Sequence, residues 1–332
     1  MSILSTKYLG LDLKNPIIAA SSGLTGKIDY LIELENAGVS AIVLKSLFEE
    51  DILAEINKQR STVITASSIY PEIYDAFTYD EMEDSVSKYI NLIKSAKSKL
   101  SIPIIASINC VSANEWTTYA KMIQDAGADA LELNMFIMPS DFNRTAEENE
   151  KVYFDVIEKV KSNVSIPIAL KISYHFSNLA NMIKRLSDTG IDGLVLFNRY
   201  YNPDIDIDNI KVIPGILYSK PSDIHLVLRW IAIVANRINC SLAATTGIHD
   251  GQSVIKMILA GADVVQIAST IYYNEFEVIT NMLNFVKLWM SQHDFESINE
   301  FRGILSQSSL GNPAAYERVQ FMKHFAGKLT LG

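Results

Sequence analysis

The sequence is poor in the residues from which metal sites and disulfides are made. It has two cysteines among 332 residues, Cys110 and Cys240, too few for an iron–sulfur site or a disulfide framework. Its five histidines show no spacing typical of metal ligands. We therefore predict no metal site. Because so few cysteines suit a reducing compartment, we also predict a cytoplasmic protein.

Long hydrophobic runs and excess positive charge are missing too. The longest apolar run, Trp230–Ala235, has six residues, whereas a membrane-spanning helix needs about 20. Residues 1–10 lack the cationic start and apolar stretch of a signal peptide. The net charge is −9 at pH 7, which disfavours binding to nucleic acid or to an anionic membrane. We expect neither as a partner.

A repeated joint indicates that helices and strands alternate. In four places an amphipathic stretch ends at a glycine that a short apolar run follows, and these glycines are Gly38, Gly127, Gly190 and Gly261. Glycine is favoured there because the residue after the last helical turn often has a left-handed backbone. In two further places a proline, Pro103 or Pro167, ends a helix and opens a strand.

The apolar runs are typical of buried parallel strands. We predict eight: Ile17–Ser21, Ala41–Lys45, Ile104–Ile108, Ala130–Asn134, Ile168–Ile172, Gly193–Phe197, Leu242–Thr245 and Val264–Ile267. Eight βα units predict an α/β protein with the fold of a (β/α)8 TIM barrel. A doubly wound open sheet is the alternative, but no Gly-x-Gly-x-x-Gly turn follows any of these strands.

Two connections are too long to be simple turns. Ser46–Thr78 follows the second predicted strand and Asn198–Lys220 follows the sixth. Both leave the carboxyl ends of strands, where barrel enzymes build their active sites, so we expect them to form pocket walls or lids. We assign the barrel, a single domain, to residues 1–305. Residues 306–332 are assigned to a C-terminal extension packed on or beside it.

Four of the apolar strands end in polar residues that a packed barrel interior does not need. These are Lys45, Asn134, Lys171 and Asn198. A single strand could simply reach solvent there, with the charged end of a lysine in water. Four such residues at one rim predict a polar site on the carboxyl face of the barrel.

The seventh and eighth strands end in small residues. Thr246 and Gly247 follow one, and Ala268 and Ser269 follow the other. Small side chains let backbone N–H groups approach a ligand, and the loops after these strands are the usual phosphate site of such barrels. Ordinary tight packing of short loops is the alternative. With two lysines at the same rim, we predict a phosphorylated ligand.

In this order, these segments resemble the class 1 dihydroorotate dehydrogenases, FMN-dependent (β/α)8 barrels of pyrimidine synthesis. The resemblance runs from about Leu9 to Leu305. The residues that carry it are Asn15–Ser21, Lys45 with Ser46, Glu132–Asn134, Lys171, Asn198, Thr246 with Gly247, Ala268 with Ser269, and Ser297–Gly303.

The resemblance implies FMN as cofactor and dihydroorotate, or a similar small anion, as substrate. The residues that it implies for FMN binding are Ala20, Ser21, Lys45, Ser46, Asn134, Lys171, Thr246, Gly247, Ala268 and Ser269. It implies Lys45, Asn134 and Asn198 for substrate binding, and a homodimer. Since the chain has no nicotinamide fingerprint and no cysteine cluster, we expect a diffusible or partner-held electron acceptor.

The sequence departs from the family at the catalytic base. Class 1 members carry a cysteine just beyond the asparagine that Asn134 matches, whereas Met135–Ser140 contains none. We take Ser140, with Lys45 and Asn134, as the catalytic set, and Cys110 as an alternative base. The family's Asn-Met-Gly-Leu-Pro-Asn substrate loop is also absent, since residues 66–76 read differently.

Three functions therefore stay open. The first is dihydroorotate oxidation, and the second is an FMN oxidoreductase of the same family with another anionic substrate. The third is a flavin-binding subunit without catalytic activity. A protein that binds no flavin would instead suggest a phosphate-binding isomerase or aldolase, with Lys171 as a Schiff-base lysine.

Overall fold

Eight parallel strands close into a barrel in the computed structural model, which describes residues 3–50, 52, 84–109, 115–199, 202–311 and 314–317. The strands are β3 (Ile17–Ala19), β4 (Ala41–Val43), β6 (Ile104–Asn109), β7 (Ala130–Asn134), β8 (Ile168–Ile172), β9 (Gly193–Leu196), β12 (Ser241–Thr245) and β13 (Val264–Ile267). Their order is β4-β3-β13-β12-β9-β8-β7-β6, and β6 pairs back to β4, which closes the barrel. The predicted (β/α)8 fold is confirmed.

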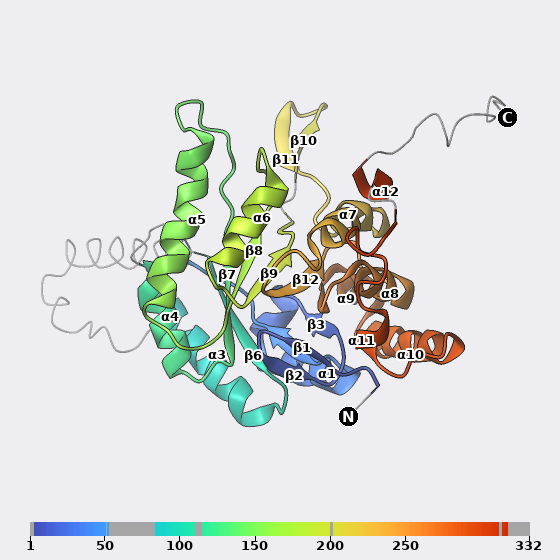
Figure 1. The fold of residues 1–332 in the computed structure, drawn as a ribbon. Helices are drawn as coiled ribbons and strands as arrows, with labels where there is room; N and C mark the ends of the chain where they lie inside the picture. Colours follow the sequence, from blue (N-terminus) through green and yellow to red (C-terminus); the bar gives the residue numbers. More distant parts are fainter. Residues whose placement is uncertain are drawn as a thin grey trace, which may run out of the picture.

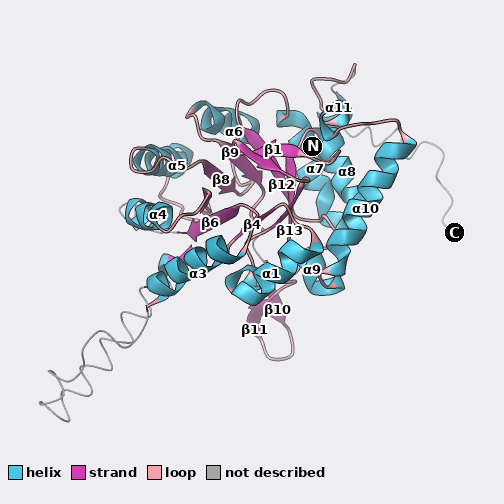
Figure 2. Cartoon of the chain, turned by 90° about the horizontal axis from the view of Figure 1, so that it is seen from below, coloured by secondary structure: helices cyan, strands magenta, loops and turns pink. Residues whose placement is uncertain are grey.

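Helices surround the barrel on the outside (Figures 1 and 2). They are α1 (Ile28–Ala37), α3 (Ser85–Lys99), α4 (Glu115–Asp125), α5 (Ala146–Lys161), α6 (Leu179–Asp188), α7 (Ile224–Val234), α8 (Gly251–Ala260), α9 (Ser269–Asn274), α10 (Glu277–Gln292), α11 (Ile298–Phe301) and α12 (Ala314–Glu317). Two short 3-10 turns, η1 (Gly23–Gly26) and η3 (Pro221–Asp223), lie at the carboxyl face. No helix of the described residues is long and apolar enough to cross a membrane.

The repeated glycine joint ends helices as the sequence predicts. Gly38 and Gly261 have φ of 112° and 119°, and the N–H of each bonds back to carbonyls of the preceding helix. The same repeat supplies Asp129, Asp192 and Asp263, whose carboxylates accept hydrogen bonds of 2.7–2.8 Å from the N–H of the first or second residue of a neighbouring strand. The joint thus ends a helix and also fixes the start of the adjacent strand.

Alternate residues of each strand face opposite sides, so the barrel has two buried faces. One face packs on the helices, and the other fills the interior with a smaller apolar cluster that includes Ile18, Val43 and Val195. A hairpin of β1 (Thr6–Tyr8) and β2 (Leu11–Leu13) adds Tyr8 and Leu9 to that interior cluster. The hairpin therefore closes the amino end of the barrel and leaves the carboxyl end for a ligand.

The connection after the sixth barrel strand contains an antiparallel hairpin of β10 (Pro203–Asp206) and β11 (Lys211–Pro214). This hairpin projects from the barrel (Figure 1). The connection after the second strand begins with β5 (Leu47–Phe48), which pairs with β6. Residues 51 and 53–83, which include most of the predicted connection Ser46–Thr78, lie outside the described residues, as does Cys110.

The described part of the predicted C-terminal extension lies against α7. The N–H of Gln307 donates to the carbonyl of Ala232 at 2.8 Å, and Arg237 donates to the Gln307 side chain. The Tyr316 hydroxyl donates to the carbonyl of Leu305 at 2.6 Å. Residues 318–332 lie outside the described residues.

Candidate active site

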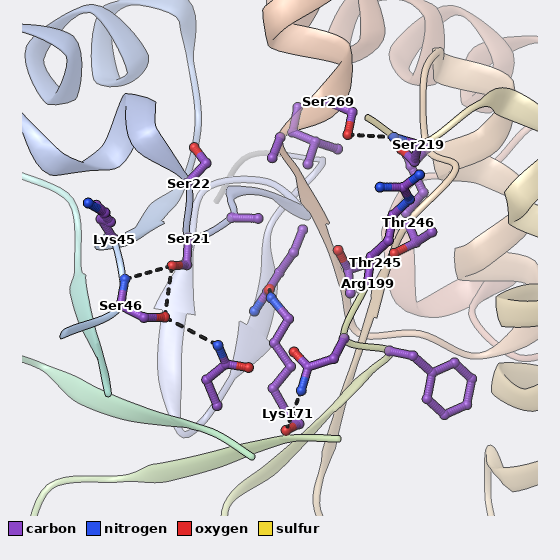
Figure 3. Close-up of a pocket in the computed structure, with 18 of the residues that line it drawn as sticks. Ser21, Ser22, Lys45, Ser46, Lys171, Arg199, Ser219, Thr245, Thr246 and Ser269 are labelled. Atoms are coloured by element: carbon purple, nitrogen blue, oxygen red, sulfur yellow. Dashed lines mark hydrogen bonds between the residues drawn. The ribbon is translucent and has the colours of Figure 1, made fainter. Parts of the chain in front are cut away.

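A pocket of about 310 Å3 opens at the carboxyl ends of the barrel strands (Figure 3). The predicted site residues that line it are Ala20, Ser21, Lys45, Ser46, Asn134, Lys171, Asn198, Thr246, Gly247, Ala268 and Ser269. Residues that are far apart in the sequence meet there because parallel strands present their carboxyl ends on one face. The structure therefore brings the predicted site residues together, with the exception of Ser140.

Ser21, Ser46 and Asn134 form one wall of the pocket, and the buried Ser107 lies behind it. The Ser46 hydroxyl lies 3.1 Å from that of Ser21 and 2.8 Å from that of Ser107, and it accepts from Asn134 Nδ2 at 3.4 Å. Asn134 Oδ1 is buried, and no residue in the described part of the chain donates a hydrogen bond to it. A buried acceptor is costly to leave unpaired, so this oxygen is suited to a donor on a ligand.

Tyr89 fixes this wall from behind. Its hydroxyl accepts from the Ser107 N–H at 2.8 Å and donates to the Ser107 carbonyl at 3.0 Å. Burial raises the pKa of Tyr89 well above its ordinary value, so the phenol stays neutral. Tyr89 thus fixes the backbone of Ser107, whose hydroxyl lies against that of Ser46.

Lys171 extends from β8 into the pocket (Figure 3). Its Nζ lies 3.5 Å from Glu132 Oε1 and 3.5 Å from Gln266 Oε1, and Gln266 Nε2 donates to Glu132 Oε2 at 2.7 Å. Lys171 is 8% exposed and Glu132 1%. A buried cation needs a charged partner, and Glu132 supplies it from the adjacent strand β7.

Asn198 ties the ends of two strands together. Its Nδ2 donates to the carbonyls of Met135 at 2.9 Å and Lys171 at 3.2 Å, and its own N–H donates to Ile172 at 2.8 Å. The residue is buried. Its amide is therefore held in one orientation where it lines the pocket.

Thr246 and Gly247 form a tight turn with positive φ of 83° and 76°. A Cβ at Gly247 would lie 2.7 Å from the Cα of Ile224, so only glycine fits against the start of α7. Among the described residues, the N–H groups of Gly247 and Ile248 have no hydrogen-bond partner. Two such donors beside a pocket suit an anionic ligand group.

Ser219 links this turn to the loop after β13. Its N–H donates to the Ser269 hydroxyl at 3.0 Å (Figure 3), and its own hydroxyl lies 3.1 Å from His249 Nε2. Burial lowers the pKa of His249 below its ordinary value, so the ring is neutral at neutral pH. His249 thus supports Ser219 as a hydrogen-bonding residue of the loop, without adding a charge to the site.

Lys45 and Ser140 differ in where they lie. Lys45 is exposed at the rim, its stem packs beside Gly26, and no described residue pairs with its ammonium. Ser140 is exposed too, but it does not line the pocket, and its N–H donates to the Met138 carbonyl at 2.8 Å. The structure therefore leaves Ser140 outside the constellation to which the sequence assigns it.

Comparison with known proteins identifies the family. A family model described as dihydroorotate dehydrogenase matches residues 3–288. The chain belongs to the dihydroorotate dehydrogenase family. This confirms the family predicted from the sequence, and with it a flavin-dependent class of dehydrogenases.

Curated relatives agree over nearly the whole chain. One from Thermoplasma volcanium is 26% identical over 315 residues, which cover 92% of this chain and 99% of the relative. One from Methanocaldococcus jannaschii is 25% identical and covers 83% and 90%, and one from Bacillus mycoides is 24% identical and covers 91% and 97%. Each is named dihydroorotate dehydrogenase B (NAD(+)), catalytic subunit.

The pocket of this dihydroorotate dehydrogenase family member also contains residues that are absent from the predicted site, among them Arg199, Ser219 and Gln266. Gln266 carried a signal, since it interrupts the apolar run of β13. Arg199 and Ser219 lie in the connection Asn198–Lys220, which the sequence predicts as a pocket wall or lid, but nothing in the sequence singles out these two residues within it. The guanidinium of Arg199 donates to the carbonyls of Ile216 at 2.9 Å and Tyr218 at 3.1 Å.

Arg199→Met is expected to loosen the loop that carries Ser219. The variant loses hydrogen bonds from a charged donor to three successive carbonyls, 216–218, each bond worth about 1.5–3 kcal/mol before water replaces it. Amide hydrogen exchange at residues 216–219 should accelerate at least about tenfold. Lys211→Met, an exposed cation of the same connection, is the control. Unchanged exchange in Arg199→Met would contradict the role of the guanidinium as a clamp.

Proposed function

We propose that this protein is an FMN-dependent oxidoreductase that acts on a CH–CH bond of a small anionic substrate, with dihydroorotate as the first candidate. The observation that carries the proposal is the buried ammonium of Lys171 in a pocket that also contains the turn at Gly247 and Ile248. The N–H groups of that turn bond to no residue that the structure describes. One pocket thus offers a cation for a redox-active ring and donors for a phosphate.

The residues present suit FMN. We assign the phosphate to the turns at Thr246–Gly247 and Ala268–Ser269, where backbone donors and small side chains leave room. We assign the ring system to the wall and floor made by Ala20, Ser21, Ser46, Asn134, Lys171 and the stem of Lys45. The bound flavin supplies the two-electron chemistry that amino-acid side chains lack.

The chain's own residues bind and orient. Lys171 stabilises negative charge at the pocket floor, and Lys45 binds the carboxylate of the substrate from the rim. Asn134, through an Oδ1 to which no described residue donates, and Asn198 orient the substrate by hydrogen bonds. Ser140 completes the proposed catalytic set as proton acceptor, which requires the loop at Met135–Ser140 to bring it into the pocket.

That requirement favours a second candidate, an FMN oxidoreductase of the same family with another anionic substrate. None of Met135, Phe136, Ile137, Met138 and Pro139 has a side chain that can accept a proton, and Ser140 lies outside the pocket. A substrate whose reaction needs no base at this position would suit the pocket as it stands.

We also propose how the protein is organised. The relatives named as NAD(+)-dependent catalytic subunits support an electron acceptor that is diffusible or held by a partner. We propose a cytoplasmic homodimer, with the FMN-binding barrel over residues 1–305 and the extension over residues 306–332.

The visible spectrum of the purified protein under anaerobic conditions tests the proposal. We expect a flavin spectrum that dihydroorotate bleaches. If the flavin stays oxidised in the presence of dihydroorotate, the second candidate or a flavin-binding subunit without catalytic activity would be supported instead. A protein that takes up no FMN would contradict both FMN oxidoreductase proposals.

Lys45→Ala is expected to weaken the binding of an anionic ligand about tenfold, because it removes one charged hydrogen-bond donor from the rim. The dissociation constant of orotate, read from its perturbation of the flavin spectrum, checks this without requiring turnover. Lys27→Ala removes the same charge from an exposed residue that does not line the pocket. Equal affinities in the two variants would contradict carboxylate binding by Lys45.

A further inference from the structure

A group of polar side chains lies in the barrel interior between the pocket and the amino-terminal hairpin. Glu132, Lys171 and Gln266 come from the strands β7, β8 and β13, and all three are buried. Lys171 and Gln266 line the pocket, whereas Glu132 does not. Beyond them lies Tyr8 of the hairpin, also buried. Lys171 and Glu132 are both buried, so water screens their mutual attraction only weakly.

Gln266 orders the group. It accepts from the Lys171 ammonium through Oε1 and donates to Glu132 through Nε2, so its amide bridges the cation and the anion. Glu132 Oε1 faces Lys171 at 3.5 Å. No described residue donates a hydrogen bond to this oxygen. The ammonium is thus close enough for strong attraction but is not locked to the carboxylate by a short hydrogen bond.

Tyr8 places no charge of its own beside this pair. Burial, and next the charge of Glu132, raise the pKa of the Tyr8 phenol well above its ordinary value, so it stays neutral. The side chain of Gln266 interacts with the Tyr8 hydroxyl and lowers this pKa slightly, without outweighing the effect of burial. Lys171 and Glu132 are therefore the charged members of the group, and any ligand that gains charge at the pocket floor meets both.

We propose that Glu132 acts as a positioning residue and counter-charge for Lys171 and thereby lowers the reduction potential of the bound flavin. The inference rests on the proposed function, since it assigns the ring of FMN to the pocket floor. A flavin that takes two electrons and one proton gains negative charge, which Lys171 stabilises and the carboxylate of Glu132 opposes. Glu132 thus holds the ammonium of Lys171 in place and also limits how strongly that ammonium favours reduction of the flavin.

Glu132→Gln tests this with little change of shape. The amide oxygen of the new side chain can still accept from Gln266, while the negative charge is gone. At a fixed potential and pH 7, the ratio of reduced to oxidised flavin should rise at least about tenfold, which corresponds to about 30 mV for a two-electron couple. Equilibration with a reference dye during slow reduction of the FMN-loaded protein measures this ratio.

Tyr8→Phe is the matched control, because it removes one polar atom from the same buried group without changing the charge. The potential of this variant should equal that of the parent. Glu132→Met removes the charge with an apolar side chain of similar length, and it should also raise the potential. It replaces Glu132→Gln if the latter does not fold.

The outcomes separate this inference from the proposed function. If the parent protein binds no FMN, both the proposed function and the role of Glu132 are contradicted. If the parent binds FMN but Glu132→Gln or Glu132→Met leaves the reduction potential of the flavin unchanged, only the role of Glu132 as a counter-charge is contradicted. A lowered reduction potential would also contradict the counter-charge role, because it would mean that replacing Glu132 had displaced the ammonium of Lys171.

Discussion

Lys171→Met is expected to destabilise the protein and to slow reduction of its flavin more than any other single change at the pocket. Removal of the ammonium leaves the carboxylate of Glu132 buried without its cation, which costs about 3–5 kcal/mol of unfolding free energy. It also removes the charge that we propose to stabilise the reduced ring, so the reduction rate should fall by about 10²–10³. Urea unfolding and anaerobic stopped-flow spectroscopy measure the two effects.

The double variant Lys171→Met with Glu132→Gln separates these effects. Because it removes both charges, it should recover most of the unfolding free energy, while the reduction rate stays low. If the double variant were as unstable as Lys171→Met alone, the stability loss would come from packing and not from a stranded charge. A reduction rate near that of the parent would contradict the assignment of Lys171 to the flavin.

Gly247→Ala is the second large effect that we expect. The residue has a φ of 76°, and an added Cβ would meet backbone atoms of Asp223 and Ile224 at the start of α7, with the Asp223 carbonyl carbon at 2.8 Å. The left-handed backbone costs about 1–2 kcal/mol and the overpacking about 1–3 kcal/mol. Since the turn offers its N–H groups to the proposed phosphate, FMN affinity should fall at least about tenfold. Fluorescence titration with FMN and urea unfolding measure the two losses.

Gly127→Ala supplies the matched control. Gly127 also has a positive φ, 95°, but a Cβ there would meet nothing within 4 Å. This variant should lose only the backbone contribution, about 1–2 kcal/mol, and should keep its affinity for FMN. Similar losses in both variants would mean that the close approach of α7 contributes little at Gly247.

The sequence by itself determines the barrel and most of the proposed site. All eight strands appear where short apolar runs predict them, because burial on both faces requires apolar side chains throughout. The glycines of the repeated joint mark helix ends because their backbone is left-handed. Once the strands are placed, polar residues at their carboxyl ends must meet at one rim, which is how Lys45, Asn134 and Lys171 could be predicted together.

Only the tertiary structure decides which side chains touch. Gln266 lies 134 residues from Glu132 and 95 from Lys171 in the sequence, yet their side chains meet inside the barrel. No local pattern encodes that contact, since it depends on closure of the barrel and on strand register, such as the pairing of Asn134 with Lys171. No local pattern encodes the positions of Arg199 and Ser140 either, because each depends on the path of the loop that carries it. Local preferences select helices and strands, whereas the partners of a buried charge follow from long-range packing.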